Sequence, residues 1–419
     1  MGRVRTSVTK HQPPASPPRP ADGTLAPDSV TLALIHALIP LGRRAVEEAL
    51  QPEVVALAGA RYARGSGKPG LARWGAQRGS VYLADQKVPV TVPRVRDLQA
   101  GVEVPLTTYA QLQTPCAQDA GLFARVLGGL SSREYHAAAE AMPEAFGLAK
   151  SSVSRRFVHA SARALQQVQE RRLDDHQWLV LLLDGKTFAS DQLVIALGVT
   201  TTGEKRVLGL VQTATENNAV CAALLRDVEA RGFVAPHGLL VVLDGAKGLR
   251  AAVRDVYGSD VAVQRCQWHK RENVVGYLSK PLQVLWRRKL QAASAHPAHA
   301  DATRTLQRLH KELVVLNASA ANSLAEGLDE TLTRHRLGVV AALGVSFKTT
   351  NLIENVMSQL ERKTQRVAQW RTRDQQLRWC AAALLQLQPR LRRITGCDQL
   401  PLLQAALRNK LHLATPAAA

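Results

Sequence analysis

Two aspartates stand directly after short apolar runs in this sequence. Asp184 follows six apolar residues that begin at Trp178, and Asp244 follows five that begin at Leu239. Runs of this length are too short to span a membrane and are typical of strands buried on both faces. Sites in α/β proteins gather where such strands end. Two neighbouring strands would therefore bring two carboxylates together, as in a metal site. The alternative is that each Asp-Gly pair is a simple turn.

A third carboxylate is needed for metal-dependent phosphodiester chemistry, because two cations sit about 3.5–4 Å apart in such sites. The candidate is Glu354, in the first turn of a helix predicted to begin near Asn351. Asn351 with Glu354 also fits an N-cap and its N3 partner, so Glu354 could instead cap the helix. Glu361 lies two turns further on among basic residues, and we expect it to be a solvated ion-pair partner. Oxygen ligands of this kind favour Mg²⁺ or Mn²⁺.

The order of predicted elements around the aspartates indicates an α/β fold of the ribonuclease H-like type. Strands are expected near 178–184, 193–199 and 206–212, followed by a helix near 218–231, a strand at 239–243, a helix at 246–255 and a strand at 261–266. A ribonuclease H-like sheet carries its first acid on its first strand and its second acid on its fourth. Asp184 and Asp244 occupy those two places.

A helical bundle is predicted to interrupt this unit. Leucines and one tryptophan recur at helical spacing after Lys270: Leu282, Leu285, Trp286, Leu290, Leu306, Leu309, Leu313, Leu316, Leu324, Leu328 and Leu332. We therefore predict a catalytic domain made of 173–270 and 340–385, an all-helical insertion at 271–339, and a C-terminal tail at 386–419.

A DNA-binding domain of the helix-turn-helix type is predicted at 106–172. Ser131 with Glu134 fits a capping box, and Pro143 and Gly147 separate a first helix from a second. The second helix opens with small hydroxyl residues, which permit close approach to DNA, and with basic residues, which can contact it: Lys150, Ser151, Ser152, Ser154, Arg155 and Arg156. An ordinary helical hairpin with a basic face would look similar.

The region before it, 29–105, is predicted to hold a helix from about Val30 to Leu57 and a β-hairpin at 81–92. Pro89 and Pro93 place the second arm of the hairpin toward a sheet edge. A glycine-rich basic stretch at 61–80 includes Arg73 and Arg78, interleaved with Tyr62 and Trp74. Such a stretch suits phosphate contacts, although a solvated loop explains it equally well. Residues 1–28 form a basic Pro-rich tail that we expect to be disordered.

The composition favours a nucleic acid partner. The chain of 419 residues has 54 Lys and Arg against 34 Asp and Glu, a formal net charge of +20. Charge of this sign and size indicates a polyanionic partner, nucleic acid before membrane. No run approaches the roughly 18 apolar residues of a membrane helix. The five cysteines include no C-x-x-C pair, which indicates reduced thiols in a cytosolic protein.

Four motifs taken together resemble bacterial insertion-sequence transposases of the Mutator class. They are "LLLDGKTF", "VLDGAKGL", "QRCQWHKRENVV" and "TTNLIENVMSQLERKTQRVAQWR", and the similarity runs from about Ala60 to Gly396. The resemblance implies a ribonuclease H-like catalytic domain with an all-helical insertion, after a mainly helical N-terminal DNA-binding region. The acid triad of the class maps onto Asp184, Asp244 and Glu354.

A Cys-x-x-His signature of the same class maps onto Cys266 and His269, with Trp268 between them, beside the active site. As zinc ligands the pair would need two further partners, and the sequence has no second pair at the usual spacing. We therefore expect a packing or hydrogen-bonding role for Cys266 and His269. Trp268 is a candidate to stack on an unpaired base.

The resemblance implies a metal-dependent DNA transposase. Such an enzyme binds the terminal inverted repeats of its element, cleaves with two Mg²⁺ (or Mn²⁺) ions and joins the 3′-OH to target DNA. A homodimer or higher oligomer on DNA is expected, in the bacterial cytoplasm in association with the nucleoid and with no membrane partner. The alternative is a catalytically silent DNA-binding regulator derived from a transposase. A structure-specific nuclease on the same fold is disfavoured by the predicted helix-turn-helix and insertion.

Overall fold

The computed structural model describes residues 41–63, 67–83, 86–113, 123, 125–129, 149–188, 191–214, 217–258, 261–365, 367 and 369–411. The chain divides into two compact units, one formed mainly by residues before 115 and one by 115–141 together with 146 onward. The predicted tail at 1–28 and the first predicted helix of the helix-turn-helix lie outside the described residues.

The first unit is a small mixed α/β unit. Residues 41–49 are helical and are followed by α2 (Gln51–Ala58), β1 (Leu71–Leu83), β2 (Gln86–Asp97), β3 (Glu103–Val104) and α3 (Thr107–Gln113). The sheet order is β1-β2-β3. Its core is made of Val46, Leu50, Val54, Val81, Val90, Val92, Val95 and Leu106. The prediction of a mainly helical N-terminal region is therefore wrong for this unit. It contains a three-stranded sheet, and alternating valines of β2 pack against the helices.

The predicted hairpin is present and longer than expected. The glycine-rich basic stretch is a strand from Leu71 onward, so Arg73 and Arg78 lie on β1 and not on a flexible loop. Arg73 Nε donates to the carbonyl of Gly59 at 2.9 Å, which ties β1 to the end of α2. β2 is the middle strand of this sheet, so the prediction that Pro89 and Pro93 place it toward an edge is wrong; β3 pairs with β2 at Val95 and Arg96, past both prolines.

The second unit is organised on a five-stranded sheet. Its strands are β4 (Trp178–Phe188), β5 (Asp191–Thr200), β6 (Lys205–Thr213), β7 (Leu239–Leu243) and β8 (Val261–Arg265). The order is β6-β5-β4-β7-β8, with β4 to β6 antiparallel and β7 and β8 running parallel to β4. All five strands predicted from the apolar runs are present. β4 lies in the centre, and its residues from Trp178 to Asp184 are buried.

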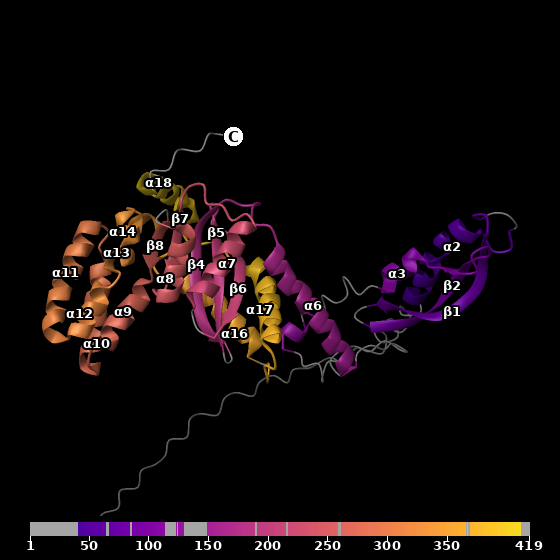
Figure 1. Cartoon of the computed structure of the whole chain (residues 1–419), viewed down its shortest axis with the longest axis horizontal. Helices are drawn as coiled ribbons and strands as arrows, with labels where there is room; N and C mark the ends of the chain where they lie inside the picture. Colours follow the sequence, from indigo (N-terminus) through magenta and orange to yellow (C-terminus); the bar gives the residue numbers. More distant parts are fainter. Residues whose placement is uncertain are drawn as a thin grey trace, which may run out of the picture. The chain divides into compact units, whose positions relative to one another are not determined.

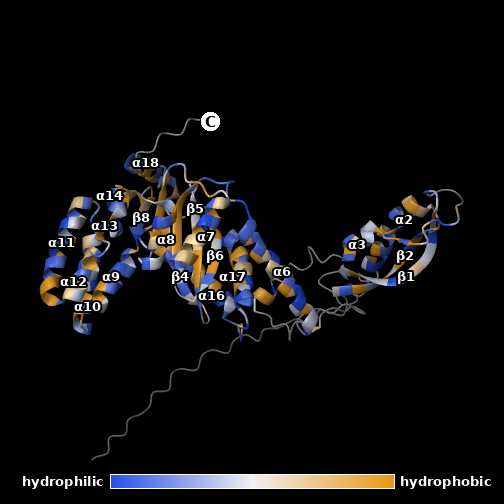
Figure 2. Ribbon diagram, viewed as in Figure 1, coloured by the Kyte–Doolittle hydropathy of each residue, from blue (hydrophilic) through white to orange (hydrophobic). Residues whose placement is uncertain are grey.

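Helices cover both faces of this sheet (Figure 1). Leu181 and Leu183 of β4 pack on the side of α7 (Asn218–Ala230) and α8 (Lys247–Tyr257). Val180 and Leu182 pack on the other side, which is covered by α6 (Lys150–Glu170), α16 (Asn351–Thr364), α17 (Arg373–Leu387) and α18 (Leu400–Leu411). Figure 2 shows the strands as continuous hydrophobic bands, as expected of a sheet buried on both faces.

Two predicted boundaries are corrected by this packing. α6 was assigned to a separate domain at 106–172, but it packs on α17 through the rings of Phe157 and Trp379, 4.5 Å apart. The segment 386–419 was predicted to be a tail. It contains two 3₁₀ turns (Gln388–Arg390 and Cys397–Gln399) and α18, whose Leu400, Leu403 and Leu407 are fully buried in the core.

The insertion is helical, as predicted. It begins after α9 (Gln267–Gly276) and comprises α10 (Lys280–Ala295), α11 (His299–Leu316), α12 (Ala318–Ala325), α13 (Leu328–Thr331) and α14 (Thr333–Arg336), with α15 (Val340–Leu343) leading back to the sheet. Its own core includes Trp286, Leu290, Leu306, Leu309, Leu313 and Leu324. Leu285 and Leu316 are about half exposed, because Leu285 lies off the buried face of α10 and Leu316 ends α11. Among the described helices, none is both long and apolar enough to cross a membrane.

Candidate active site

The two aspartates lie side by side where the pairing of β4 with β7 ends. These strands are parallel neighbours, and Leu183 pairs with Leu243, so the next residue along each strand is an acid. Asp184 lies within β4, which continues to Phe188, and Asp244 directly follows β7. Asp184 Oδ1 accepts the N–H of Gly185 at 3.1 Å. Asp244 Oδ1 accepts the N–H of Ala246 at 2.8 Å, in the turn that leads into α8. Asp244 therefore closes a turn and also presents a carboxylate beside Asp184. The turn and the carboxylate site, given as alternatives for this Asp-Gly pair, are both present.

Gly245 is required at this turn by its geometry. Its φ of +101° lies in the region that side-chain-bearing residues rarely adopt. A Cβ at this position would also meet Nε of Arg265 at 2.1 Å. Arg265 ends β8, is almost fully buried and donates through Nη1 to the carbonyl of Glu326 at 3.1 Å. The turn beside Asp244 is thus backed by a guanidinium that also contacts the insertion.

Glu354 joins the aspartates from α16. The pKa of Asp184 is raised to about 7, first by burial and then by the negative charges of Asp244 and Glu354, with His269 opposing the shift. Asp184 and Asp244 are neighbours through the pairing of β4 with β7, and Glu354 is near enough for its charge to act on Asp184. A cluster of carboxylates that resist sharing negative charge is suited to binding cations.

Thr350 stands directly before α16, at the position that the sequence predicted for Asn351, and its side chain makes no capping hydrogen bond. Thr350 occupies the N-cap position, and Asn351 is the first helical residue. The Thr350 hydroxyl donates to Oε1 of Glu354 at 2.5 Å. Its backbone N–H donates to Sγ of Cys266 at 3.5 Å. A capping-box glutamate would accept a hydrogen bond from this same N–H, which is therefore already bonded elsewhere. Glu354 is not the N3 partner of an N-cap at Asn351.

Cys266 and His269 complete this arrangement. Cys266 follows β8 and holds the N-cap position of α9, and His269 lies one turn further along the helix. The Thr350 hydroxyl lies 3.4 Å from both Cys266 Sγ and His269 Nδ1. Among the described residues, Cys266, His269 and Glu354 form the group of three His, Cys, Asp or Glu side chains whose ligand atoms all lie within 4.8 Å of one another.

The charges of this pair act on the acids. A hydrogen bond with Cys266 raises the pKa of His269 to about 9 against the opposing effect of burial, and Glu354 and Asp244 add to the rise. Burial raises the pKa of the Cys266 thiol, but hydrogen bonds from His269 and Thr350 outweigh it and the net pKa is lowered. The positively charged form of His269 is thus favoured beside Asp244 and Glu354.

Lys186 and Glu361 form an exposed ion pair at the edge of the site. Lys186 Nζ lies 2.6 Å from Glu361 Oε2, and both side chains are about half exposed. Glu361 is an ion-pair partner as predicted, but its partner comes from β4 and not from the basic residues beside it on α16. Lys186 is thus an exposed lysine on β4.

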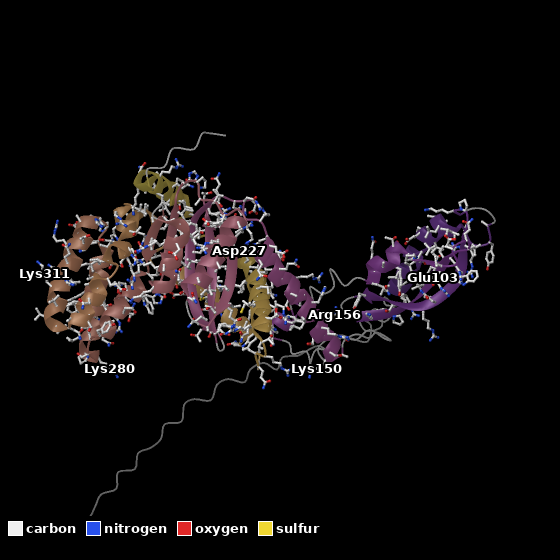
Figure 3. All side chains as sticks on the ribbon, viewed as in Figure 1. Glu103, Lys150, Arg156, Asp227, Lys280 and Lys311 are labelled. Carbon is white, nitrogen blue, oxygen red and sulfur yellow. The ribbon has the colours of Figure 1, made fainter. Side chains whose placement is uncertain are left out.

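The predicted DNA-reading residues lie at the start of α6, where Figure 3 labels Lys150 and Arg156. Lys150, Ser151, Ser154 and Arg155 are exposed, and Ser152 is half-buried. Arg156 is only 9% exposed, because it lies on the face of α6 that packs into the unit. Its predicted role as a DNA contact is therefore wrong as stated, whereas the other five remain predictions.

Sequence reasoning did not find Thr350, Arg265 or the cavities of this unit. A threonine directly before a predicted helix is an N-cap signal that could have identified Thr350. A cavity of about 580 Å³ lies between α6 and α17, and basic side chains from both helices and from the end of α16 line it, among them Lys150, Lys363 and Arg378. These residues are far apart in the sequence, so no local pattern links them.

The chain combines a formal net charge of +20 with two carboxylates on neighbouring strands of an α/β sheet. The profile of the protein family described as "Transposase, Mutator family" matches residues 34–389. The chain belongs to this family.

Individual relatives agree with this assignment. The chain is 28% identical over 258 residues to the transposase for insertion sequence element IS6120 of Mycolicibacterium smegmatis, which covers 57% of this chain and 74% of the relative. It is 32% identical over 199 residues to the transposase for IS406 of Burkholderia multivorans, 46% of this chain and 49% of the relative. A similar match, 28% over 204 residues, is to the transposase for IS905 of Lactococcus lactis, 47% of this chain and 50% of the relative.

Proposed function

We propose that this chain is a DNA transposase that binds the ends of its insertion element, cleaves a phosphodiester there and joins the resulting 3′-OH to target DNA. The observation that carries the proposal is the placement of Asp184 and Asp244 beside each other on neighbouring strands, with the charge of Glu354 acting on Asp184, in a chain that belongs to the Mutator family. The strand order, with one acid on the first strand and one directly after the fourth, supports a ribonuclease H-like catalytic unit. The helical insertion between α9 and α16 fits the same proposal.

The three carboxylates are the proposed ligands of Mg²⁺, with Mn²⁺ as a substitute. Their oxygen atoms suit hard divalent cations, and burial together with the negative charges of Asp244 and Glu354 raises the pKa of Asp184, so a bound cation would offset the cost of its charge. When bound, two such ions supply an activated water or 3′-OH and stabilise the leaving oxygen. Thr350 holds the Glu354 carboxylate by a hydrogen bond, and Gly245 with Arg265 holds the turn beside Asp244.

DNA is the proposed partner, as terminal inverted repeats and as target. The formal net charge of +20 supports this, as do the exposed arginines Arg155 on α6 and Arg78 on β1. Work at two element ends calls for at least a homodimer on DNA. The proposed setting is the bacterial cytoplasm, where the element and its targets lie.

The proposal is tested with the full chain and labelled duplexes carrying the ends of its own element. Asp184→Asn, Asp244→Asn and Glu354→Gln keep side-chain shape and remove a metal-binding charge, so each is expected to abolish cleavage and strand transfer while end binding persists. Glu361→Gln is the matched control, because it changes the same residue type on the same helix in an exposed ion pair. We expect it to retain most activity, since such pairs contribute about 0–1 kcal/mol.

Two outcomes would contradict the proposal. Cleavage by Glu354→Gln at near the parental rate in Mg²⁺ would remove Glu354 from the site, and loss of activity in folded Glu361→Gln would transfer its role to that residue. A parental chain that binds its element ends tightly yet cuts none of them in Mg²⁺ or Mn²⁺ would favour the silent regulator.

A further inference from the structure

A second cavity lies at the junction of the sheet unit and the insertion, where α9 and α10 meet the segment that leads into α16. Its volume is about 360 Å³, and its walls come from the first turn of α9, from α10 and from the segment 345–352 that leads into α16. Gln267 and Trp268 line it, next in sequence to Cys266 and His269. Asn351 and Leu352 line it from the same helical turn that carries Glu354. The residues that line the cavity on α9 and α16 are therefore close in sequence to Cys266, His269 and Glu354.

The size of the cavity limits what it can hold. Sites for small molecules range from about 300 to 1,000 Å³, and this one lies near the lower end. A DNA duplex cannot enter a hollow of this volume, whereas a single nucleotide that has left the base stack can. Polar groups suited to the edge of a base are present on the wall, among them Gln267, Gln291 and Asn351.

The aromatic surface of the cavity is supplied by Trp268. Its side chain is 46% exposed, although it stands beside a buried cysteine in the middle of the second unit. The indole ring meets the imidazole of His269 edge to face, with centroids 4.8 Å apart, which orients it against the active-site pair. Its remaining surface is open, and every base has a face that stacks on such a ring.

The electrostatic surroundings favour an anion. Lys348 lines the cavity, and its pKa is lowered first by burial and then by the positive charges of Arg334 and Arg271. Arg334 is almost fully buried and donates to the carbonyl of Gly344 at 2.7 Å. Within the described part of the chain, no carboxylate pairs with Lys348 or Arg334. A phosphate group would compensate this uncancelled positive charge.

Backbone geometry marks the same wall as unusual. Phe347 lines the cavity with φ of +60°, a left-handed conformation that a bulky side chain rarely adopts. The residue is buried, so packing holds it there. Strain of this kind concentrates at functional segments, where the surrounding structure fixes it.

We propose that this cavity binds one unstacked nucleotide of the element's end DNA, with the base on Trp268 and a phosphate beside Lys348. The inference rests on the proposed function, because it takes the DNA that the three acids would cut as its ligand. One nucleotide held here is displaced from the duplex next to the phosphodiester at the acids. Displacing it costs stacking and pairing, and contact with Trp268 offsets that cost.

The experiment measures binding of the full chain to duplexes of its own element end in Ca²⁺. Trp268→Ala is expected to weaken binding to the intact duplex roughly tenfold, the size of one base–aromatic contact. The measurement is then repeated on duplexes with a single abasic nucleotide at each position around the cleavage site. At one position the difference between the parent and Trp268→Ala is expected to vanish, because no base remains to stack. At the other positions the tenfold difference persists.

Matched variants control for position and charge. Tyr277→Ala removes an exposed aromatic ring near the other end of α9, outside the cavity wall, and should leave affinity unchanged. Lys348→Ala should lower the slope of log affinity against log salt by about one. Lys311→Ala, on the exposed face of α11 (Figure 3), should not change the slope.

The results separate the two levels of the argument. If Trp268→Ala binds the intact duplex as tightly as the parent, or loses the same factor at every abasic position, the cavity does not hold a base and the inference fails. That failure leaves the transposase proposal standing as long as the parental chain prefers its own ends and Asp184→Asn does not cut them. If the parental chain shows no preference for its own ends over unrelated duplex, the proposed function itself fails.

Discussion

Replacing Thr350 by valine tests whether the hydrogen bond from the Thr350 hydroxyl is needed to position the carboxylate of Glu354. Valine keeps the shape of threonine, so the change removes a hydroxyl and little volume. That hydroxyl is fully buried, donates to Glu354 at 2.5 Å and touches both Cys266 and His269. Hydrogen bonds to charged groups contribute about 1.5–3 kcal/mol, and we expect Thr350→Val to lower the free energy of unfolding by about that amount.

The effect on the active site should be larger than the effect on stability suggests. Groups that orient a metal ligand typically alter metal affinity or activity by about 10–100-fold when removed. We therefore expect the Mg²⁺ concentration for half-maximal end cleavage by Thr350→Val to rise by about that factor. Thr350→Ser keeps the hydroxyl and loses one methyl group, so its Mg²⁺ dependence should stay near the parental one at a cost of about 0.8 kcal/mol in stability.

Thr364 provides the control on the same helix. It is equally buried, and its hydroxyl donates to the carbonyl of Leu360 at 3.1 Å, away from the acids. Thr364→Val should lower stability by about 0.5–1.5 kcal/mol and leave the Mg²⁺ dependence unchanged. The two readouts are a thermal or urea melt and a cleavage titration. Equal Mg²⁺ curves for Thr350→Val and Thr364→Val would refute the idea that Thr350 positions Glu354.

Three further predictions concern other parts of the molecule. Arg155→Ala should weaken end binding and lower the salt slope by about one in a binding titration, without the folding defect expected of changes at the buried Arg156. Metal analysis of protein purified without added metal should find no stoichiometric zinc, because the Thr350 hydroxyl lies between the three candidate ligands; about one zinc per chain, lost in Cys266→Ser, would overturn this. Gly245→Ala should lower stability by about 1–3 kcal/mol in a melt, because of its φ of +101° and the 2.1 Å approach to Arg265.

The elements that carry the aspartates were predictable because their signals are local. Six apolar residues before Asp184 indicate a buried strand whatever the rest of the chain does, and strand order then follows from the alternation of elements. The same holds for the insertion, where leucine spacing predicted the helices. Leu400, Leu403 and Leu407 carry a helical spacing too, so the signal for α18 was present in the segment assigned to a tail.

Other features depend on contacts that no local pattern contains. β1 is rich in glycine and arginine and reads as a loop, but it is held as a strand by its partner β2 and by the core that includes Val81 and Val90. The contact between Cys266 and Thr350 joins residues 84 positions apart. The face of α6 that buries Arg156 depends on α17, which lies more than 200 residues further along the chain. These are tertiary effects that override intrinsic preference.

The insertion is joined to the site at both of its ends, and this gives it a role beyond added surface. Where the chain leaves the sheet, two hydrogen bonds join it to the segment that returns from the insertion. Thr350 N–H donates to Cys266 Sγ at 3.5 Å, and Gln267 N–H donates to the carbonyl of Lys348 at 3.2 Å. Thr350 then holds Glu354.

Asp244 is linked to the helical insertion as well. The Arg265 side chain packs against the turn beside Asp244 and donates a hydrogen bond to the carbonyl of Glu326. Glu354 is thus linked to the returning end of the insertion through Thr350, and the turn beside Asp244 is linked to the insertion through Arg265.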